Sequence, residues 1–304
     1  MKYDQILITG VAGFIGSKVA RRFCEEGHRV IGVDDLSNGT KKNIPSEVEF
    51  ILGDISVPDI VQKIPRGCKI ILHLAGQSSG EISFDNPVVD LQRNTISTLN
   101  LIHYGIENRS ERIVYASSMS VYGSVIDEPV KENHPCEPIS CYGVGKLASE
   151  HYLKIYQNKL PFVLLRMFNV YGPGQDLSNL RQGMVSIYLA QALNDQRIEV
   201  KGDLMRFRDL IYIDDVTEVW YRSSFSSSAL NEELNLGTGI RSTVDKIIKQ
   251  IKVEIPGTTH FISSPTPGDQ SGIFSDNSKL KKIMGINKFI SFEKGLNKFT
   301  KYLK

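Results

Sequence analysis

The chain has few of the residues that build disulfide frameworks or metal sites. Its 304 residues include four cysteines and six histidines, and none has the spacing of paired disulfides or of metal ligands. No apolar run is long enough to span a bilayer, and the first residues lead into a strand pattern rather than a signal peptide. We therefore expect a protein of a reducing cytoplasm, with no metal and no membrane partner.

Neither sign of charge is in excess. The chain has 36 basic and 34 acidic residues, for a net charge of +2, so nothing in its charge predicts a nucleic-acid partner. Apolar residues make up 41% of the chain and charged residues 23%, which is typical of a globular protein. The length predicts one large domain or two smaller ones.

The N-terminal segment has the pattern of a dinucleotide site. A short apolar strand over 5–9 precedes Gly10-Val-Ala-Gly13-Phe-Ile-Gly16, and a helical pattern follows to about residue 26. Such a turn lets backbone N–H groups approach a pyrophosphate at the helix N-terminus. Asp34 ends the next strand, where a carboxylate accepts hydrogen bonds from a ribose and disfavours a 2′-phosphate. The segment therefore predicts NAD rather than NADP.

A second stretch supplies groups that move protons. Ser118 ends the strand pattern of 112–118, and Tyr142 and Lys146 are four residues apart in a helical pattern, so they share one face. An ammonium beside a phenol favours the phenolate, and we expect it to lower the pKa of Tyr142. A hydroxyl, a phenol and an amine are what proton removal from an alcohol requires. Tyr-x-x-x-Lys alone is common and gains weight only beside a nucleotide site.

Strand and helix patterns alternate, which predicts the α/β class with a Rossmann-type doubly wound parallel sheet. A long helix is expected over 85–108, and His73 is expected to be a core residue of a strand. After residue 169 the pattern changes, with a Gly/Pro loop expected over 170–175 and a strand expected over 208–213. We predict an NAD-binding domain over 1–169, to which segments of about 208–240 return, and a smaller interleaved C-terminal substrate-binding domain over most of 170–304.

Taken in order, these motifs resemble the extended short-chain dehydrogenase/reductase family. Within it they are most similar to the NAD-dependent nucleotide-sugar epimerases and dehydratases, and the UDP-hexose 4-epimerases fit best. The resemblance covers nearly the whole chain and includes Asn169 before Gly172-Pro-Gly174 and Arg208-Asp209 before two further acids.

The resemblance implies roles for individual residues. The implied catalytic residues are Ser118, Tyr142 and Lys146. The implied cofactor contacts are Gly10, Gly13, Phe14, Ile15, Gly16, Asp34, Asn38, Asp54, Ile55, Leu74, Ala75, Gly76, Tyr142 and Lys146. The implied substrate contacts are Ser118, Tyr142, Asn169, Val185, Arg208 and Asp269, with Arg206 as a second cation.

The resemblance also implies a reaction and an assembly. Tyr142 would take the proton of the sugar 4-hydroxyl while hydride passes to NAD, and the 4-keto sugar would turn before both are returned. Helices around 90–107 and 142–157 would pair in a homodimer. The expected setting is surface polysaccharide or galactose metabolism.

Other reactions on the same scaffold stay open. Dehydratases of the family carry Asp-Glu where this chain has Met119 and Ser120, which argues against dehydration. Met167 and Thr266 differ from the usual residues of glucose/galactose epimerases, and Ile273 does not decide whether the sugar is N-acetylated. The alternatives are an unusual dehydratase, a 2-epimerase, a 4-keto reductase and a non-catalytic NAD-binding protein.

Overall fold

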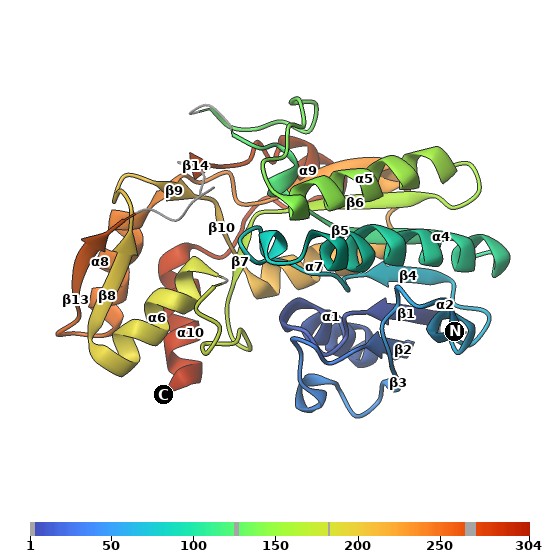
Figure 1. Cartoon of the computed structure of the whole chain (residues 1–304), viewed down its shortest axis with the longest axis horizontal. Helices are drawn as coiled ribbons and strands as arrows, with labels where there is room; N and C mark the ends of the chain where they lie inside the picture. Colours follow the sequence, from blue (N-terminus) through green and yellow to red (C-terminus); the bar gives the residue numbers. More distant parts are fainter. Residues whose placement is uncertain (1–3, 125–127, 182, 265–271) are drawn as a thin grey trace.

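The computed structural model describes residues 4–124, 128–181, 183–264 and 272–304. At its centre is a seven-stranded sheet in which every pairing is parallel (Figure 1). The strand order is β11-β6-β5-β4-β1-β2-β3. The strands are β1 (Gln5–Thr9), β2 (Arg29–Asp34), β3 (Glu49–Leu52), β4 (Ile70–His73), β5 (Arg112–Ser118), β6 (Phe162–Met167) and β11 (Glu232–Leu236). The predicted doubly wound parallel sheet is confirmed.

The two faces of the sheet have separate cores, because successive strand side chains point to opposite sides. Ile6 and Ile8 of β1 pack with α1 (Phe14–Glu25) and α7 (Ile213–Phe225). Leu7 packs on the opposite face, which is covered by α2 (Pro58–Gln62), α4 (Ser97–Glu107) and α5 (Cys141–Tyr156). β2 and β3 lie on one side of β1, whereas β4, β5 and β6 lie on the other side. At such a change of side a crevice opens at the carboxyl ends of the two strands, here β1 and β4.

The helix expected over 85–108 is divided into three parts. Asn86 caps α3 (Pro87–Leu91) by accepting a hydrogen bond from the Val89 N–H at 3.1 Å. A π-helical turn, Gln92–Ile96, follows, and α4 then continues to Glu107. A π turn inserts an extra residue and is frequent at functional sites. Here it holds the fully buried Asn94 beside α5.

A smaller lobe lies beside the carboxyl end of the sheet (Figure 1). It contains α6 (Met184–Asp195), β8 (Arg197–Lys201), α8 (Val244–Glu254), β13 (Thr259–Ser263) and α10 (Phe292–Leu303). Leu189, Ile198, Ile247 and Phe299 belong to its own core. The sequence did not predict β13, because four of its five residues are exposed and show no alternation. Of the helices described, none is both long and apolar enough to cross a bilayer.

Short strands connect the lobe to the sheet. β7 (Asn169–Tyr171) pairs in parallel with β10 (Leu210–Tyr212), and β9 (Phe207–Arg208) lies between β12 (Ser242–Thr243) and β14 (Gly272–Ile273). The expected loop after residue 169 thus begins as a strand. The expected strand over 208–213 is interrupted at Asp209, which belongs to neither β9 nor β10, although its carbonyl oxygen accepts a hydrogen bond from the Asn169 N–H of β7 at 3.0 Å. The remaining helix, α9 (Ser278–Met284), packs against β11.

Candidate active site

Two cavities meet at the carboxyl edge of the sheet. The first has a volume of about 320 Å³ and lies over the β1–α1 turn, and we call it the β1 cavity. The second has a volume of about 570 Å³ and extends from Ser118 to the small lobe, and we call it the lobe cavity. Tyr142 and Met167 line both of them. The structure thus places one phenol at the junction of two ligand-sized spaces.

Glycines shape the floor of the β1 cavity. Gly10 has a φ of +71°, which L side chains rarely adopt. A Cβ atom on Gly16 would overlap the Gly10 carbonyl oxygen. Gly13 precedes the first turn of α1 without a side-chain cap, so the N–H groups of that turn stay available to a ligand. This backbone cradle at a helix N-terminus suits a pyrophosphate.

Asp34 closes one end of the β1 cavity at the tip of β2. Its two carboxylate oxygens accept hydrogen bonds from the Ala12 N–H at 2.9 Å and the Leu36 N–H at 2.8 Å. Burial raises the pKa of Asp34, and these two N–H groups oppose the rise. The remaining lone pairs can accept from ribose hydroxyls. The cavity is also lined by the other predicted cofactor contacts, Phe14, Ile15, Asn38, Asp54, Ile55, Leu74, Ala75 and Gly76.

Ser118, Tyr142 and Lys146 come together where the two cavities join. Ser140 caps α5 by accepting a hydrogen bond from the Gly143 N–H at 3.1 Å, which fixes the helix start beside Tyr142. Ser118 is the last residue of β5, and Ser118 and Tyr142 both line the lobe cavity. Lys146 lines the β1 cavity, with its Nζ atom 5.7 Å from the Tyr142 ring centroid.

The pKa of Tyr142, beside Lys146, differs from the direction expected from the sequence. Burial raises the pKa of Tyr142 to about 12, although the polar Ser118 hydroxyl acts to lower it. Burial also lowers the pKa of Lys146 to about 8, against the nearby carboxylates of Asp90 and Glu150, which raise it. The expected lowering of the Tyr142 pKa by the ammonium is therefore wrong for the chain alone, because desolvation is the larger effect on both groups.

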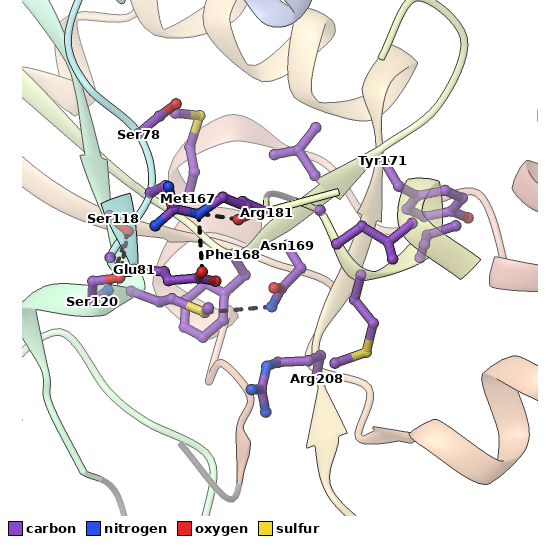
Figure 2. A pocket seen from close by; sticks show the side chains of 18 of the residues that line it. Ser78, Glu81, Ser118, Ser120, Met167, Phe168, Asn169, Tyr171, Arg181 and Arg208 are labelled. Atoms are coloured by element: carbon purple, nitrogen blue, oxygen red, sulfur yellow. Dashed lines mark hydrogen bonds and ion pairs between the residues drawn. The ribbon is translucent and has the colours of Figure 1, made fainter. Parts of the chain in front are cut away.

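The far wall of the lobe cavity carries a buried cation. Arg208 on β9 is 6% exposed, and its Nη1 atom donates to the Phe207 carbonyl oxygen at 2.8 Å. Its side chain lines the lobe cavity (Figure 2). Burial, aided by repulsion from Arg206, lowers the pKa of Arg208 to about 10, so it stays charged at neutral pH. This burial argues against a surface ion pair as its role. A cation facing a cavity suits a phosphate oxygen.

The other predicted substrate contacts surround the same cavity. Asn169 and Val185 line it, and the Asn169 Nδ2 group donates to the Met119 sulfur at 3.4 Å (Figure 2). Met119 thus presents a thioether where an acid would be needed for dehydration. Asp269 and Thr266 lie outside the described residues.

Asp209 is a structural residue of the site that sequence reasoning missed. It is fully buried and accepts five hydrogen bonds, from the N–H and hydroxyl groups of Thr238 and Ser275 and from the Gly239 N–H, at 2.6–3.1 Å. It thereby ties the segment of Arg208 to the loop after β11 and to the segment after β14. The sequence feature that could have indicated this role is the acidic residue Asp209 between two strand patterns.

An ion-pair group at the mouth of the lobe cavity was also missed. Arg181 pairs with Glu81 at 3.0 Å (Figure 2) and with Asp85 at 2.8 Å, so it joins two segments that are far apart in the sequence. All three side chains are exposed, so no local sequence signal marks the contact.

His73 is a buried structural residue, as predicted. Its ring nitrogens hydrogen-bond with the hydroxyls of Thr9 at 2.8 Å and Thr98 at 3.1 Å, and burial lowers its pKa to about 3. No cluster of three or more metal-ligating side chains is found within the described ranges.

Comparison with known proteins identifies the family. Residues 6–237 match the model of the NAD dependent epimerase/dehydratase family. A putative UDP-glucose 4-epimerase of Methanocaldococcus jannaschii is 33% identical, with 98% of both chains covered. The chain therefore belongs to this family of NAD-dependent nucleotide-sugar enzymes.

Solved structures agree with this assignment. The UDP-glucose 4-epimerase of Thermotoga maritima with UDP-glucose superposes with a TM-score of 0.94 at 31% identity, over 98% of both chains. TunA, an NAD-dependent NDP-hexosamine 5,6-dehydratase, superposes with a TM-score of 0.88 at 26% identity, over 99% of this chain and 97% of its own. Relatives of one fold thus perform different reactions.

Proposed function

We propose that the protein is a UDP-hexose 4-epimerase that works through a 4-keto intermediate. The observation that carries the proposal is the position of Tyr142, which lines both the β1 cavity and the lobe cavity, with Ser118 also lining the lobe cavity. A sugar in the lobe cavity would present a hydroxyl to Tyr142. A nicotinamide in the β1 cavity would lie on the Lys146 side.

The chain's own residues would bind, orient and exchange a proton. Arg208 would hold the diphosphate, and Asn169 and Val185 would position the nucleotide sugar. Ser118 would hydrogen-bond with the sugar 4-oxygen while Tyr142 takes its proton and later returns it. Bound NAD supplies the reversible hydride acceptor and a positive ring. A cation beside Tyr142 would favour the phenolate and offset the effect of burial on its pKa.

The Met119 side chain supports epimerisation over dehydration. Eliminating water from a sugar requires an acid and a base beside the ring. The residue after Ser118 is Met119, whose sulfur contacts Asn169, and Ser120 follows with a hydroxyl hydrogen-bonded to Ser118 at 3.2 Å. Neither is a carboxylate. Reduction of a keto sugar is the main rival and would consume reduced cofactor stoichiometrically.

The test is product analysis by proton NMR. The purified protein is incubated with UDP-glucose, UDP-galactose and their N-acetylamino counterparts, with catalytic NAD. We expect one pair to interconvert at C4 without net change in NADH. Tyr142→Phe should lose at least about 100-fold in rate, since it removes the acid–base group. Tyr302→Phe, at an exposed position of α10 away from the two cavities, is the matched control. Turnover of none of the four sugars would refute the proposal.

We further infer that two parts of the chain bind different ligands. Residues 1–169 with the returning segments of about 208–240 would bind the cofactor, and most of 170–304 would bind the substrate. The two separate cores support this, because Trp220 and Leu234 pack with the sheet while Leu189 and Phe299 pack in the lobe. The expected setting is polysaccharide or galactose metabolism in the cytoplasm.

We also infer a homodimer through α3, the π turn, α4 and α5. Exposed apolar side chains support it: Val88, Leu91 and Ile96 on one side, and Val144, Tyr152 and Ile155 on α5. Val88 and Ile155 are 64% and 71% exposed although both are apolar, and pairing with a second chain would bury them. Sedimentation at micromolar concentration should give twice the chain mass, and Ile155→Lys should give the monomer mass.

A further inference from the structure

Asp90 is a buried carboxylate that no cation compensates directly. It lies on α3, is 2% exposed, and accepts a hydrogen bond at Oδ1 from the Asn94 Nδ2 group at 3.2 Å. Its other oxygen faces α5, where a Cβ atom on Gly145 would lie 3.4 Å from it. No described cation forms an ion pair with it. Burial raises the pKa of Asp90, and the Asn94 hydrogen bond and the charge of Lys146 oppose this rise and favour the ionised carboxylate.

Asn94 connects Asp90 to the site. The Asn94 side chain sits in the π turn, and its Oδ1 atom is buried without a hydrogen-bond partner among the described residues. A Cβ atom on Gly76 would lie 2.5 Å from this oxygen and 3.4 Å from the Lys146 Nζ atom. Asn94, which is hydrogen-bonded to Asp90, and Lys146 therefore both face Gly76, which lines the β1 cavity.

Glu150 also faces Lys146, but its charge is balanced. Arg166 donates to both carboxylate oxygens of Glu150, from Nε at 2.9 Å and from Nη2 at 2.7 Å. The Ser117 hydroxyl donates to the same carboxylate at 2.5 Å. The Glu150 carboxylate therefore accepts hydrogen bonds from β5 and β6, and the positive charge of Arg166 partly offsets its effect on the pKa of Lys146.

The remaining titratable groups around the pair are neutral or engaged elsewhere. His73 on β4 is neutral, and the Tyr115 ring on β5 lies 4.9 Å from the Lys146 Nζ atom. Asp85, before α3, is paired with Arg181. Asp90 is thus the buried negative charge that acts on the pair without a cation of its own.

We propose that Asp90 is a positioning residue for the Tyr142–Lys146 pair, and that its buried carboxylate, held by Asn94, keeps a proton on the pair near neutral pH. This rests on the proposed roles of Tyr142 and Lys146 and adds what sets their proton affinity. The Asp90 charge raises the pKa of both groups. It therefore acts on their joint ionisation, whichever of them releases the proton.

The decisive experiment measures that ionisation directly. Protein labelled with ¹³C at lysine Cε and tyrosine Cζ is titrated by NMR without substrate, and the signals are assigned with Lys146→Met and Tyr142→Phe. Asp90→Asn removes the charge and preserves the side-chain size. Glu111→Gln, an exposed acid paired with Lys69, is the matched control. Epimerase rates are measured over the same pH range.

We expect the first ionisation of the pair to move to lower pH in Asp90→Asn and to stay in place in Glu111→Gln. The ratio of rates below and above pH 7.5 should rise at least about threefold, because charge–charge effects at buried sites exceed those at the surface. Asn94→Ala should act in the same direction, since the Asn94 hydrogen bond favours ionised Asp90. If Asp90→Asn does not fold, the same titration is carried out on Asn94→Ala.

An ionisation that stays in place, or moves to higher pH, in a folded variant would overturn the proposal. If the ionisation moves as expected but no sugar is epimerised, the role of Asp90 stands and the proposed reaction fails. The NMR titration needs no turnover, so the two failures are distinguishable.

Discussion

The buried ion pair of Arg166 and Glu150 allows a quantitative prediction. Arg166 on β6 is 2% exposed and Glu150 on α5 is fully buried, and two hydrogen bonds join them. Arg166 also donates to the Tyr122 hydroxyl at 3.0 Å and to the Glu132 carbonyl oxygen at 2.8 Å. Arg166→Met leaves Glu150 buried without its cation, which typically costs about 3–5 kcal/mol.

This cost corresponds to a measurable loss of thermal stability. A chain of 304 residues has an unfolding entropy of roughly 0.6 kcal/mol/K, so the melting temperature should fall by roughly 5–8 °C. Replacing both partners, Arg166→Met with Glu150→Leu, removes the unpaired charge and should recover more than half of the loss. Lys249→Met, which breaks an exposed pair with Asp245, should lower the melting temperature by less than about 2 °C.

Calorimetry or circular dichroism on the four proteins checks this reasoning. If Arg166→Met melted within about 2 °C of the wild type, the buried pair would not link α5 to β6 as we argue. If the double variant were as unstable as the single one, the loss would come from side-chain packing and not from the unpaired charge.

Three further predictions concern the cradle, the lysine and the phosphate site. Gly16→Ala should weaken NAD binding at least about tenfold in calorimetric titration, and Gly13→Ala should weaken it less, because a Cβ overlaps the Gly10 oxygen at the first position and lies 3.2 Å from it at the second. Burial lowers the Lys146 pKa from 10.5 to about 8, so the unfolded chain binds more protons between these values and wild-type stability rises with pH there. Lys146→Met should be more stable than the wild type at pH 7 by ~1–3 kcal/mol in urea unfolding, and this advantage should vanish near pH 10.5. In Asp209→Asn, the amide NH2 group would face the backbone N–H groups of Gly239 and Ser275, which displaces the Arg208 segment. The KM should therefore rise about tenfold or more, with a smaller change in kcat.

The sequence predicted the sheet well because buried parallel strands leave a strong local pattern. Gln5–Thr9 and Arg112–Ser118 are apolar runs next to turn or cap residues, and both are strands of the central sheet. The glycine turn and Asp34 were predictable for the same reason, since their spacing is set within one strand–turn–helix unit. The parallel sheet that these units build is confirmed.

Features that depend on distant contacts were not predictable. The π turn at Asn94 has no mark in the sequence, because its neighbours are ordinary helix formers and the extra residue is fixed by packing against α5. The same holds for Asp209, whose five donors come from segments near 238 and 275. The protonation of Tyr142 and Lys146 was misjudged because the effect of burial on a pKa depends on the folded environment.

The place of β11 in the sheet has a consequence for how the chain folds during synthesis. β6 pairs with β11 from Val163 and Glu232 onward, and the first half of the small lobe is made between them. Until β11 emerges from the ribosome, β6 presents an unpaired, strongly apolar edge of the kind that recruits other strands. Chains that stop before residue 232 should therefore aggregate, even though six strands of the sheet are already present.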